Sequence, residues 1–241
     1  MEVILVPAFK DNYIFLGHDS LTGETMVVDP GEAGPVLAEA DRRGWRITHI
    51  LNTHWHPDHT GGNAAVKAAT GATLIGPADE AERIPGLDRL VGHGDQVPFG
   101  GEAGEVIAVP GHTSGHIAYH FANPGVAFVG DTLFALGCGR LLEGTAEQMY
   151  DSLARLMELP DPTIVYCAHE YTEANLAFAL TVDPQSPALQ QRAETIRLAC
   201  AAGSPTVPTT ISLERSTNPF VRADTPAHFA ELRAAKDAFK G

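Results

Sequence analysis

Residues 53–62, THWHPDHTGG, hold the most chemically distinctive pattern in this sequence. Three histidines and one aspartate fall within six residues, at His54, His56, Asp58 and His59. Because only 11 of the 241 residues are histidine, chance would place an HxHxDH pattern in roughly one such chain per thousand. Imidazole and carboxylate groups are the nitrogen and oxygen ligands that suit Zn²⁺, Fe or Mn²⁺. The pattern therefore predicts a metal site in preference to a histidine-rich surface turn.

Further candidate ligands follow the ends of predicted strands. His54 comes just after an apolar run at residues 47–52, and His112, Asp131 and His169 follow runs at 105–109, 126–130 and 163–168. Strand ends of an α/β sheet can converge at one edge, where ligand sites are usually built. Five histidines and two aspartates exceed the roughly four ligands of one Zn²⁺ ion. We therefore expect two adjacent metal ions, with Asp131 as the bridge because a carboxylate has two oxygens.

The elements that would position these residues are those of a layered α/β protein. Short β-type runs at residues 3–6, 13–16 and 26–28 predict an antiparallel start. Helices predicted at 34–44, 63–69 and 146–159 then alternate with strands, including 73–75 and 117–121. From residue 175 the β signal largely disappears, and helices are predicted at 187–200 and 226–239. We expect a catalytic domain over residues 1–172 and a small helical domain over residues 173–241.

Composition and charge narrow the functional class. Hydrophobic residues make up 44% and charged residues 19% of the chain, which is typical of a soluble globular protein. A net charge of −14 argues against nucleic acid or an anionic membrane as a partner. No apolar run approaches the ~18 residues of a membrane span, and residues 1–7 lack the features of a secretory signal. Three cysteines without CxxC spacing argue against a disulfide framework and fit a reducing compartment, so we expect a cytoplasmic protein. We also expect a monomer.

Several motifs resemble those of the metallo-β-lactamase superfamily, which has an αββα sandwich fold. They are THWHPDHTGG, GHTSGH at residues 111–116, GDT at 130–132 and the late His169. Within the superfamily, the sequence is most similar to the glyoxalase II (hydroxyacylglutathione hydrolase) family. That similarity extends to GCGR at 137–140, EGT at 143–145, HEYT at 169–172, NPFVR at 218–222 and the segment 233–239. The last two segments belong to a C-terminal helical domain that most other branches lack.

The resemblance implies a binuclear thioester hydrolase. One metal would be held by His54, His56 and His112, and the other by Asp58, His59 and His169, with Asp131 between them. Zn is the first expectation for both ions, with Fe or Mn as alternatives. A hydroxide between the ions would attack the thioester carbonyl, and Asp58 would orient it. The implied reaction cleaves S-D-lactoylglutathione to D-lactate and glutathione, the second step of methylglyoxal detoxification.

The last helix explains why the C-terminal part of the chain is basic. Residues 186–241 hold five acidic and seven basic side chains, and on the predicted helix Lys236 interrupts an apolar stripe while Arg233 projects from the adjoining face. The resemblance assigns Arg233, Lys236 and Tyr171 to the glycine carboxylate of glutathione and Arg140 to its backbone. Arg140 stands where the family usually has Lys, and Leu142 where many members have Tyr. We therefore expect altered glutathione contacts with hydrolysis retained.

The sequence leaves other functions as alternatives. A glutathione-persulfide dioxygenase has a similar HxHxDH segment but uses one iron and usually lacks the C-terminal helical domain. A β-lactamase or a nucleic-acid-processing relative fits the negative charge and the C-terminal motifs less well. A catalytically dead, glutathione-responsive binding module would be expected to have lost ligands, and all seven donors are present. His116 is predicted to support the metal site by hydrogen bonding, and Cys138 and Cys167 are predicted to be packing residues.

Overall fold

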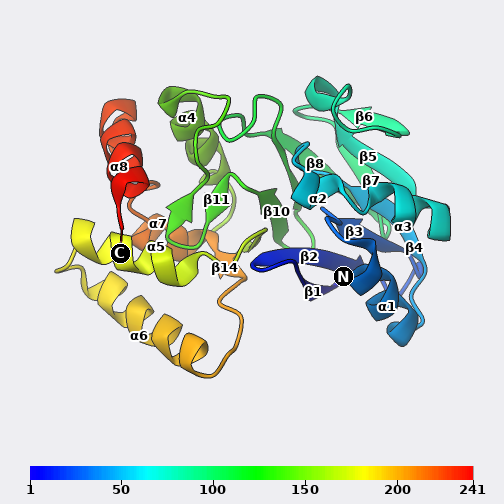
Figure 1. The fold of residues 1–241 in the computed structure, drawn as a ribbon, viewed down its shortest axis with the longest axis horizontal. Helices are drawn as coiled ribbons and strands as arrows, with labels where there is room; N and C mark the ends of the chain where they lie inside the picture. Colours follow the sequence, from blue (N-terminus) through cyan, green and yellow to red (C-terminus); the bar gives the residue numbers. More distant parts are fainter. Residues whose placement is uncertain (241) are drawn as a thin grey trace.

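Two six-stranded β-sheets form the centre of the computed structural model, which describes residues 1–240 (Figure 1). The first sheet runs in the order β1 (Glu2–Ala8), β2 (Asn12–His18), β3 (Thr25–Val28), β4 (Ile47–Leu51), β5 (Thr73–Pro77) and β6 (Arg89–Val91). The second runs in the order β14 (Thr209–Thr210), β13 (Ile164–Cys167), β10 (Val126–Gly130), β9 (Ile117–Phe121), β8 (Glu102–Ala108) and β7 (Gln96–Phe99). A separate hairpin joins β11 (Leu133–Phe134) to β12 (Gly137–Cys138).

The predicted antiparallel start is confirmed. Strands β1, β2 and β3 pair antiparallel to one another, whereas β3, β4, β5 and β6 pair in parallel. Parallel strands need crossover connections, usually helices, and the helices after β3 and β4 supply them. The carboxyl ends of β3 and β4 therefore lie at the same edge of the first sheet, where the candidate ligands begin.

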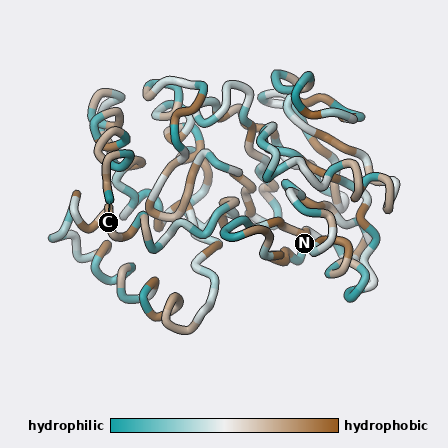
Figure 2. The backbone as a smooth tube through the Cα atoms, viewed as in Figure 1, coloured by the Kyte–Doolittle hydropathy of each residue, from teal (hydrophilic) through white to brown (hydrophobic). Residues whose placement is uncertain are grey.

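Side chains of β2 show how the first sheet comes to be buried on both faces. Tyr13 and Phe15 belong to the core between the two sheets, whereas Ile14 and Leu16 belong to a second core beneath the helices. This alternation follows from the period of two along a strand. Because both faces are covered, the strand reads as a continuous apolar run. Figure 2 shows the hydrophobic colour following the central strands.

Helices cover the outer faces of both sheets, as the αββα expectation requires. Helices α1 (Ala33–Arg43) and α3 (Asn63–Thr70) pack on the first sheet, and α4 (Ala146–Leu156) packs on the second. The short helix α2 (Pro57–Thr60) and the 3₁₀ turn η1 (Ala78–Glu80) lie in connections between strands. Helices α1 and α3 contribute Val36, Ala40 and Val66 to the core on the outer face of the first sheet. Helix α4 begins with a capping box between Thr145 and Gln148. It ends at Leu156, and residues 157–159 form turns in place of the predicted last helical residues.

The C-terminal part of the chain is helical, as predicted, but holds more helices than the sequence indicated. It contains α5 (Thr172–Val182), α6 (Pro187–Ala201), α7 (Ile211–Thr217) and α8 (Pro226–Ala238), seen together on one side of the molecule in Figure 1. Helices α6 and α8 were predicted, and α5 and α7 were not. Thr225 caps α8 and Pro226 starts it, and Phe229 is buried in the main core.

The short strand β14 connects the C-terminal part to the second sheet. Thr209 and Thr210 pair antiparallel with β13, so the β structure does not end at residue 175. The domain boundary expected between residues 172 and 173 stays a prediction. The last residue of the predicted helical domain, Gly241, lies outside the described residues. Across residues 1–240, no helix is both long and apolar enough to cross a membrane.

Candidate metal centre and substrate cavity

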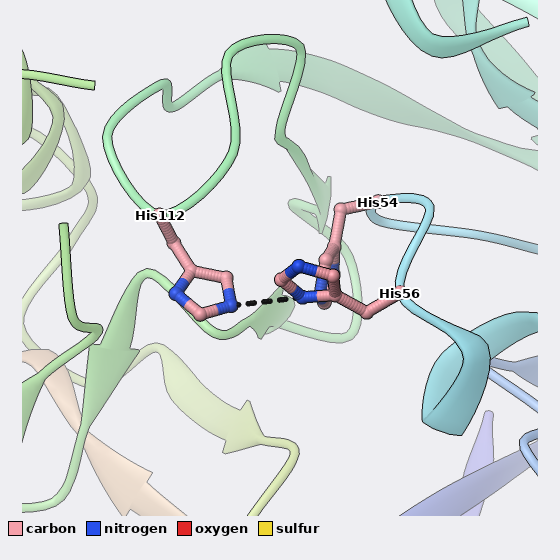
Figure 3. Close-up of side chains that lie close together, drawn as sticks. All are labelled: His54, His56 and His112. Atoms are coloured by element: carbon pink, nitrogen blue, oxygen red, sulfur yellow. Dashed lines mark hydrogen bonds between the residues drawn. The ribbon is translucent and has the colours of Figure 1, made fainter. Parts of the chain in front are cut away.

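The first cluster of candidate ligands joins two loops. His54 and His56 come from the loop between β4 and α2, and His112 comes from the loop after β8 (Figure 3). His54 Nε2 lies 2.9 Å from His56 Nδ1, and His112 Nε2 lies 3.1 Å from that same Nδ1 atom. One ring nitrogen from each histidine therefore points to a common centre, in an arrangement that could hold a metal ion.

A second cluster lies beside the first and consists of Asp58, His59 and His169. Asp58 and His59 lie on the short helix α2, and His169 follows β13. The Oδ2 atom of Asp58 is 3.4 Å from His59 Nε2 and 3.6 Å from His169 Nε2. The short helix thus turns two residues of the HxHxDH segment away from the first cluster and toward a residue more than a hundred positions later.

Asp131 lies between the two clusters. Its Oδ2 atom is 3.3 Å from His112 Nε2, and its Oδ1 atom is 3.3 Å from His169 Nε2 and 3.5 Å from His59 Nε2. Each carboxylate oxygen therefore faces a different cluster. The structure brings together all seven residues that the sequence proposed as ligands.

Unpaired atoms in these clusters fit a cation. The Nε2 atom of His59 and the Oδ1 atom of Asp131 are buried and have no hydrogen-bond partner among residues 1–240. Buried polar atoms are rarely left unpaired, and coordination of a metal ion would satisfy both. Burial lowers the pKa of His54 well below its ordinary value, and the nearby histidines lower it further. The ring is therefore neutral and offers a lone pair, which is the form that binds a metal.

Three residues that the sequence analysis did not single out hold the ligands in place. Asp11 Oδ1 lies 2.9 Å from His169 Nδ1, and Asn12 Nδ2 donates to Asp58 Oδ2 over 2.9 Å. Asp29 Oδ2 lies 3.2 Å from His59 Nδ1. Such hydrogen bonds fix the orientation of ligand side chains. Asp29 carried a usable signal, because it directly follows the apolar strand β3, as the ligands follow theirs.

His116 contacts the segment that carries the candidate ligand Asp131. It is fully buried, and its Nε2 atom accepts a hydrogen bond of 3.1 Å from the backbone N–H of Asp131. Its Nδ1 atom lies 3.3 Å from the hydroxyl oxygen of Thr132. The predicted role of His116 in hydrogen bonding near the ligands, and not as a ligand itself, agrees with these contacts.

A cavity of about 320 Å³ opens beside the metal-ligand clusters. His112 and Asp131 form part of its wall, and the four residues assigned to glutathione also line it: Arg140, Tyr171, Arg233 and Lys236. The cavity therefore connects the candidate metal ligands with the basic residues of α8. Leu142 is exposed and does not belong to this lining.

The two cations on α8 differ in how they are bonded. Arg233 is buried, donates to the carbonyl oxygen of Cys138 over 3.0 Å and pairs with Asp237 over 2.7 Å. Lys236 donates to the carbonyl oxygen of Ala174 over 2.7 Å. Burial, with Arg233 nearby, lowers the pKa of Lys236. The guanidinium of Arg233 is therefore paired with a carboxylate of its own helix, whereas Lys236 has no carboxylate partner among residues 1–240. Binding of one substrate carboxylate by both cations stays a prediction.

Comparisons with known proteins agree with this geometry. A model of the metallo-beta-lactamase superfamily matches residues 11–169, and a model of the hydroxyacylglutathione hydrolase C-terminus matches residues 170–239. A hydroxyacylglutathione hydrolase of Methylococcus capsulatus is 48% identical over the full length of both chains. One from Rhizobium meliloti is 50% identical over 99% of each chain, and one from Rhodospirillum rubrum is 53% identical over 96% of this chain and 90% of its own. The chain belongs to the hydroxyacylglutathione hydrolase family.

Solved structures of other proteins have the same fold as this chain. ETHE1 from Myxococcus xanthus is 28% identical, with a TM-score of 0.76 over 97% of this chain and 90% of its own. The BLEG-1 B3 metallo-beta-lactamase is 22% identical, with a TM-score of 0.71 over 92% of this chain and all of its own; this likeness concerns the fold alone. Membership of the superfamily and the His/Asp clusters together identify the centre as a divalent-metal site.

Proposed function

We propose that this protein is a thioester hydrolase that cleaves S-D-lactoylglutathione to D-lactate and glutathione, the second step of methylglyoxal detoxification. The observation that carries this proposal is the single cavity lined both by His112 and Asp131 and by the basic residues Arg140 and Lys236. A thioester carbonyl at one end and a carboxylate at the other would each meet complementary groups. The names of the relatives that match the full chain support the same reaction.

The residues present fit two divalent cations, with Zn first and Fe or Mn as alternatives. His54, His56 and His112 would hold one, Asp58, His59 and His169 the other, and Asp131 would reach both through its two oxygens. When bound, the cations would supply a water molecule that is deprotonated near neutral pH and a positive charge next to the thioester oxygen. The protein's own contribution is to fix the geometry of these ligands.

Asp58 is the residue best placed to orient the attacking water. Burial acts to raise its pKa, but the nearby His59 ring and a hydrogen bond from Asn12 more than offset this and leave the pKa lowered. Asp58 is therefore an ionised acceptor. Its side chain is 40% exposed, so a water molecule can reach it. In this position Asp58 can take a hydrogen bond from the water and hold it toward the carbonyl carbon.

The glutathione part of the substrate would lie along the cavity. Arg233, Lys236 and Tyr171 would bind its glycine carboxylate, and Arg140 would contact the backbone. The leaving group is a thiolate, which departs readily because its conjugate acid has a low pKa compared with an alcohol. No general acid is required to release it.

Metal content per chain and hydrolysis of S-D-lactoylglutathione, measured together on the purified protein, test this function. We expect near two metal ions per chain and rapid release of free thiol. One iron per chain, sulfur-dependent oxygen uptake and no thioester cleavage would instead establish a glutathione-persulfide dioxygenase. A protein that binds no metal and cleaves no thioester would be a binding module.

A further inference from the structure

Four of the five ligand histidines are held through the ring nitrogen that faces away from the metal centre. The partners of His54, His59, His112 and His169 are, in that order, the Thr53 hydroxyl, Asp29, the Arg140 carbonyl and Asp11. Such bonds fix the rotation of each ring and the nitrogen that carries the proton. His56 is different, because its Nδ1 atom faces the other ligands. Its Nε2 atom makes no hydrogen bond with residues 1–240.

The indole ring of Trp55 packs against His56. The two ring centroids are 4.5 Å apart, with 61° between the planes, so the imidazole packs edge-on against the indole. An edge-to-face contact of this kind restricts rotation of both rings. Since Trp55 lies between His54 and His56 in the sequence, its position also fixes the backbone that carries two ligands.

Trp55 is itself held on its face and at its nitrogen. The Arg83 guanidinium carbon lies 3.5 Å from the indole centroid, and Trp55 Nε1 donates to Glu143 Oε1 over 3.1 Å. Arg83 and Glu143 form an ion pair of 2.7 Å, which closes a ring of three residues. We call Arg83, Trp55 and Glu143 the indole clasp.

The indole clasp also reaches the loop that carries His112. The backbone N–H of Ser114 donates to Glu143 Oε2 over 2.8 Å. Glu143 therefore connects two loops: its Oε1 atom bonds to the loop of His54 and His56, and its Oε2 atom bonds to the loop of His112. The clasp spans the two loops whose relative position sets the distances within the first ligand cluster.

We propose that the indole clasp is a positioning device for His56, in which Trp55 does by packing what a hydrogen bond does for the other four ligand histidines. The proposal rests on the metal-dependent function above and adds to it three residues that touch neither metal nor substrate. Loss of Trp55 should loosen the first ligand cluster and weaken metal binding without altering the substrate cavity on α8.

The chain offers a matched control far from the centre. Arg43 lies over the ring of Trp45, with its guanidinium carbon 4.8 Å from the centroid, and pairs with Glu39 over 2.6 Å. Trp45 also stacks on a histidine, His18, with centroids 4.3 Å apart. The same residue types in a similar arrangement thus occur where no ligand is present.

The experiment compares Trp55→Leu, Trp55→Phe and Glu143→Ala with the control Trp45→Leu in the full-length protein. Apparent Zn²⁺ affinity is measured by competition with a chromophoric chelator, alongside the melting temperature, KM and kcat. Trp55→Leu should weaken Zn²⁺ binding about 10- to 100-fold and lower kcat at sub-saturating metal, with KM within twofold of wild type. Trp55→Phe, which keeps a ring beside His56 but loses the N–H, should fall between Trp55→Leu and wild type.

Two results would overturn the proposal. Zn²⁺ affinity within twofold of wild type in both Trp55→Leu and Glu143→Ala would show that His56 needs no such support. An equal loss of affinity in Trp45→Leu would show that the effect reports general destabilisation. If Trp55→Leu fails to fold, Trp55→Phe and Glu143→Ala decide the matter by the same criteria. A wild-type protein that binds no Zn²⁺, Fe or Mn²⁺ would remove the proposed function and this inference together, whereas normal wild-type binding with unaffected variants would remove only the inference.

Discussion

The imidazole of His169 and the phenol ring of Tyr171 stack face to face, with centroids 4.7 Å apart and 3° between the planes. His169 belongs to the second ligand cluster, and Tyr171 lines the substrate cavity. The wall of the cavity therefore continues directly into the metal centre. Only the ring of Tyr171 would then separate a substrate bound against its other face from the candidate metal ligand His169.

Two substitutions of Tyr171 distinguish the role of its hydroxyl group from the role of its ring. Tyr171→Phe keeps the ring over His169 but loses the hydroxyl, so KM for S-D-lactoylglutathione should rise about 3- to 10-fold, with kcat unchanged. Tyr171→Ala removes the ring as well and should also lower kcat. Steady-state kinetics on both variants test this, and a lower kcat in Tyr171→Phe would contradict it.

Asp131→Asn should reduce both metal content and hydrolysis. The amide cannot offer two anionic oxygens, so one of the two clusters loses a charged ligand. We expect metal content to fall toward one ion per chain and kcat to fall at least about 100-fold. Atomic absorption on the dialysed protein and thiol release measure the two effects. Asp88→Asn, at an exposed carboxylate that pairs with Lys67, is the control, and equal behaviour of the two variants would disprove a bridging role.

Lys236→Gln is a cleaner test of carboxylate binding than any change at Arg233. Arg233 bonds to Cys138 and Asp237, so its replacement would also disturb packing. Loss of the Lys236 charge should raise KM about 10-fold or more while kcat stays within twofold. Arg222→Gln, which breaks an exposed ion pair with Asp183 in the same region, should leave KM unchanged. An unchanged KM in Lys236→Gln would rule out the assignment.

The buried carboxyl group of Glu80 should make stability depend on pH. Burial raises its pKa above the ordinary value of 4.5, although hydrogen bonds from its neighbours oppose the rise. The folded protein then binds more protons than the unfolded chain between that value and the raised pKa, so the Glu80 contribution to stability is lost as pH rises through this window. Gln has no carboxyl group to titrate, so Glu80→Gln should not lose stability in this way as the pH rises.

Urea denaturation of wild type and Glu80→Gln at pH 4.5, 6 and 8 tests this expectation. The free energy of unfolding of Glu80→Gln minus that of wild type should increase with pH. Metal binding changes with pH in both proteins and cancels in this difference. A difference that stays constant, or that shrinks with pH, would show that the carboxyl group does not titrate as expected.

A side chain at Gly115 should destabilise the protein. A Cβ atom there would come within 2.6 Å of Glu80 Cγ and 2.9 Å of Asp79 Cβ. Gly115→Ala should lower the free energy of unfolding by about 1–3 kcal/mol. In contrast, a Cβ at Gly34, in α1, meets no atom within 4 Å, so Gly34→Ala should raise it by about 0.5–1 kcal/mol. Chemical denaturation of both variants measures the change in the free energy of unfolding. No change in Gly115→Ala would contradict the predicted clash with Glu80 and Asp79.

The sequence could predict what depends on local pattern. The ligands lie in one conspicuous segment or directly after apolar strands, and β4, β8, β10 and β13 formed where the apolar runs predicted them. Helix α5 was missed because residues such as Leu176 and Phe178 face different neighbours and leave no single polar face. Asp11 and Asn12 were missed for another reason, since their role depends on contact with residues far away in the chain.

The turn between β1 and β2 has a consequence for how the protein is made. Asp11 bonds to the side chain of His169, and Asn12 forms a backbone bridge to the same residue, which is synthesised more than 150 residues later. Contacts so distant along the chain are slow to form because a long loop must close first. On the ribosome, these two residues therefore exist long before the ligand that they support. The second cluster can therefore form only after His169 has been made, and a chain that stops before that residue cannot assemble it.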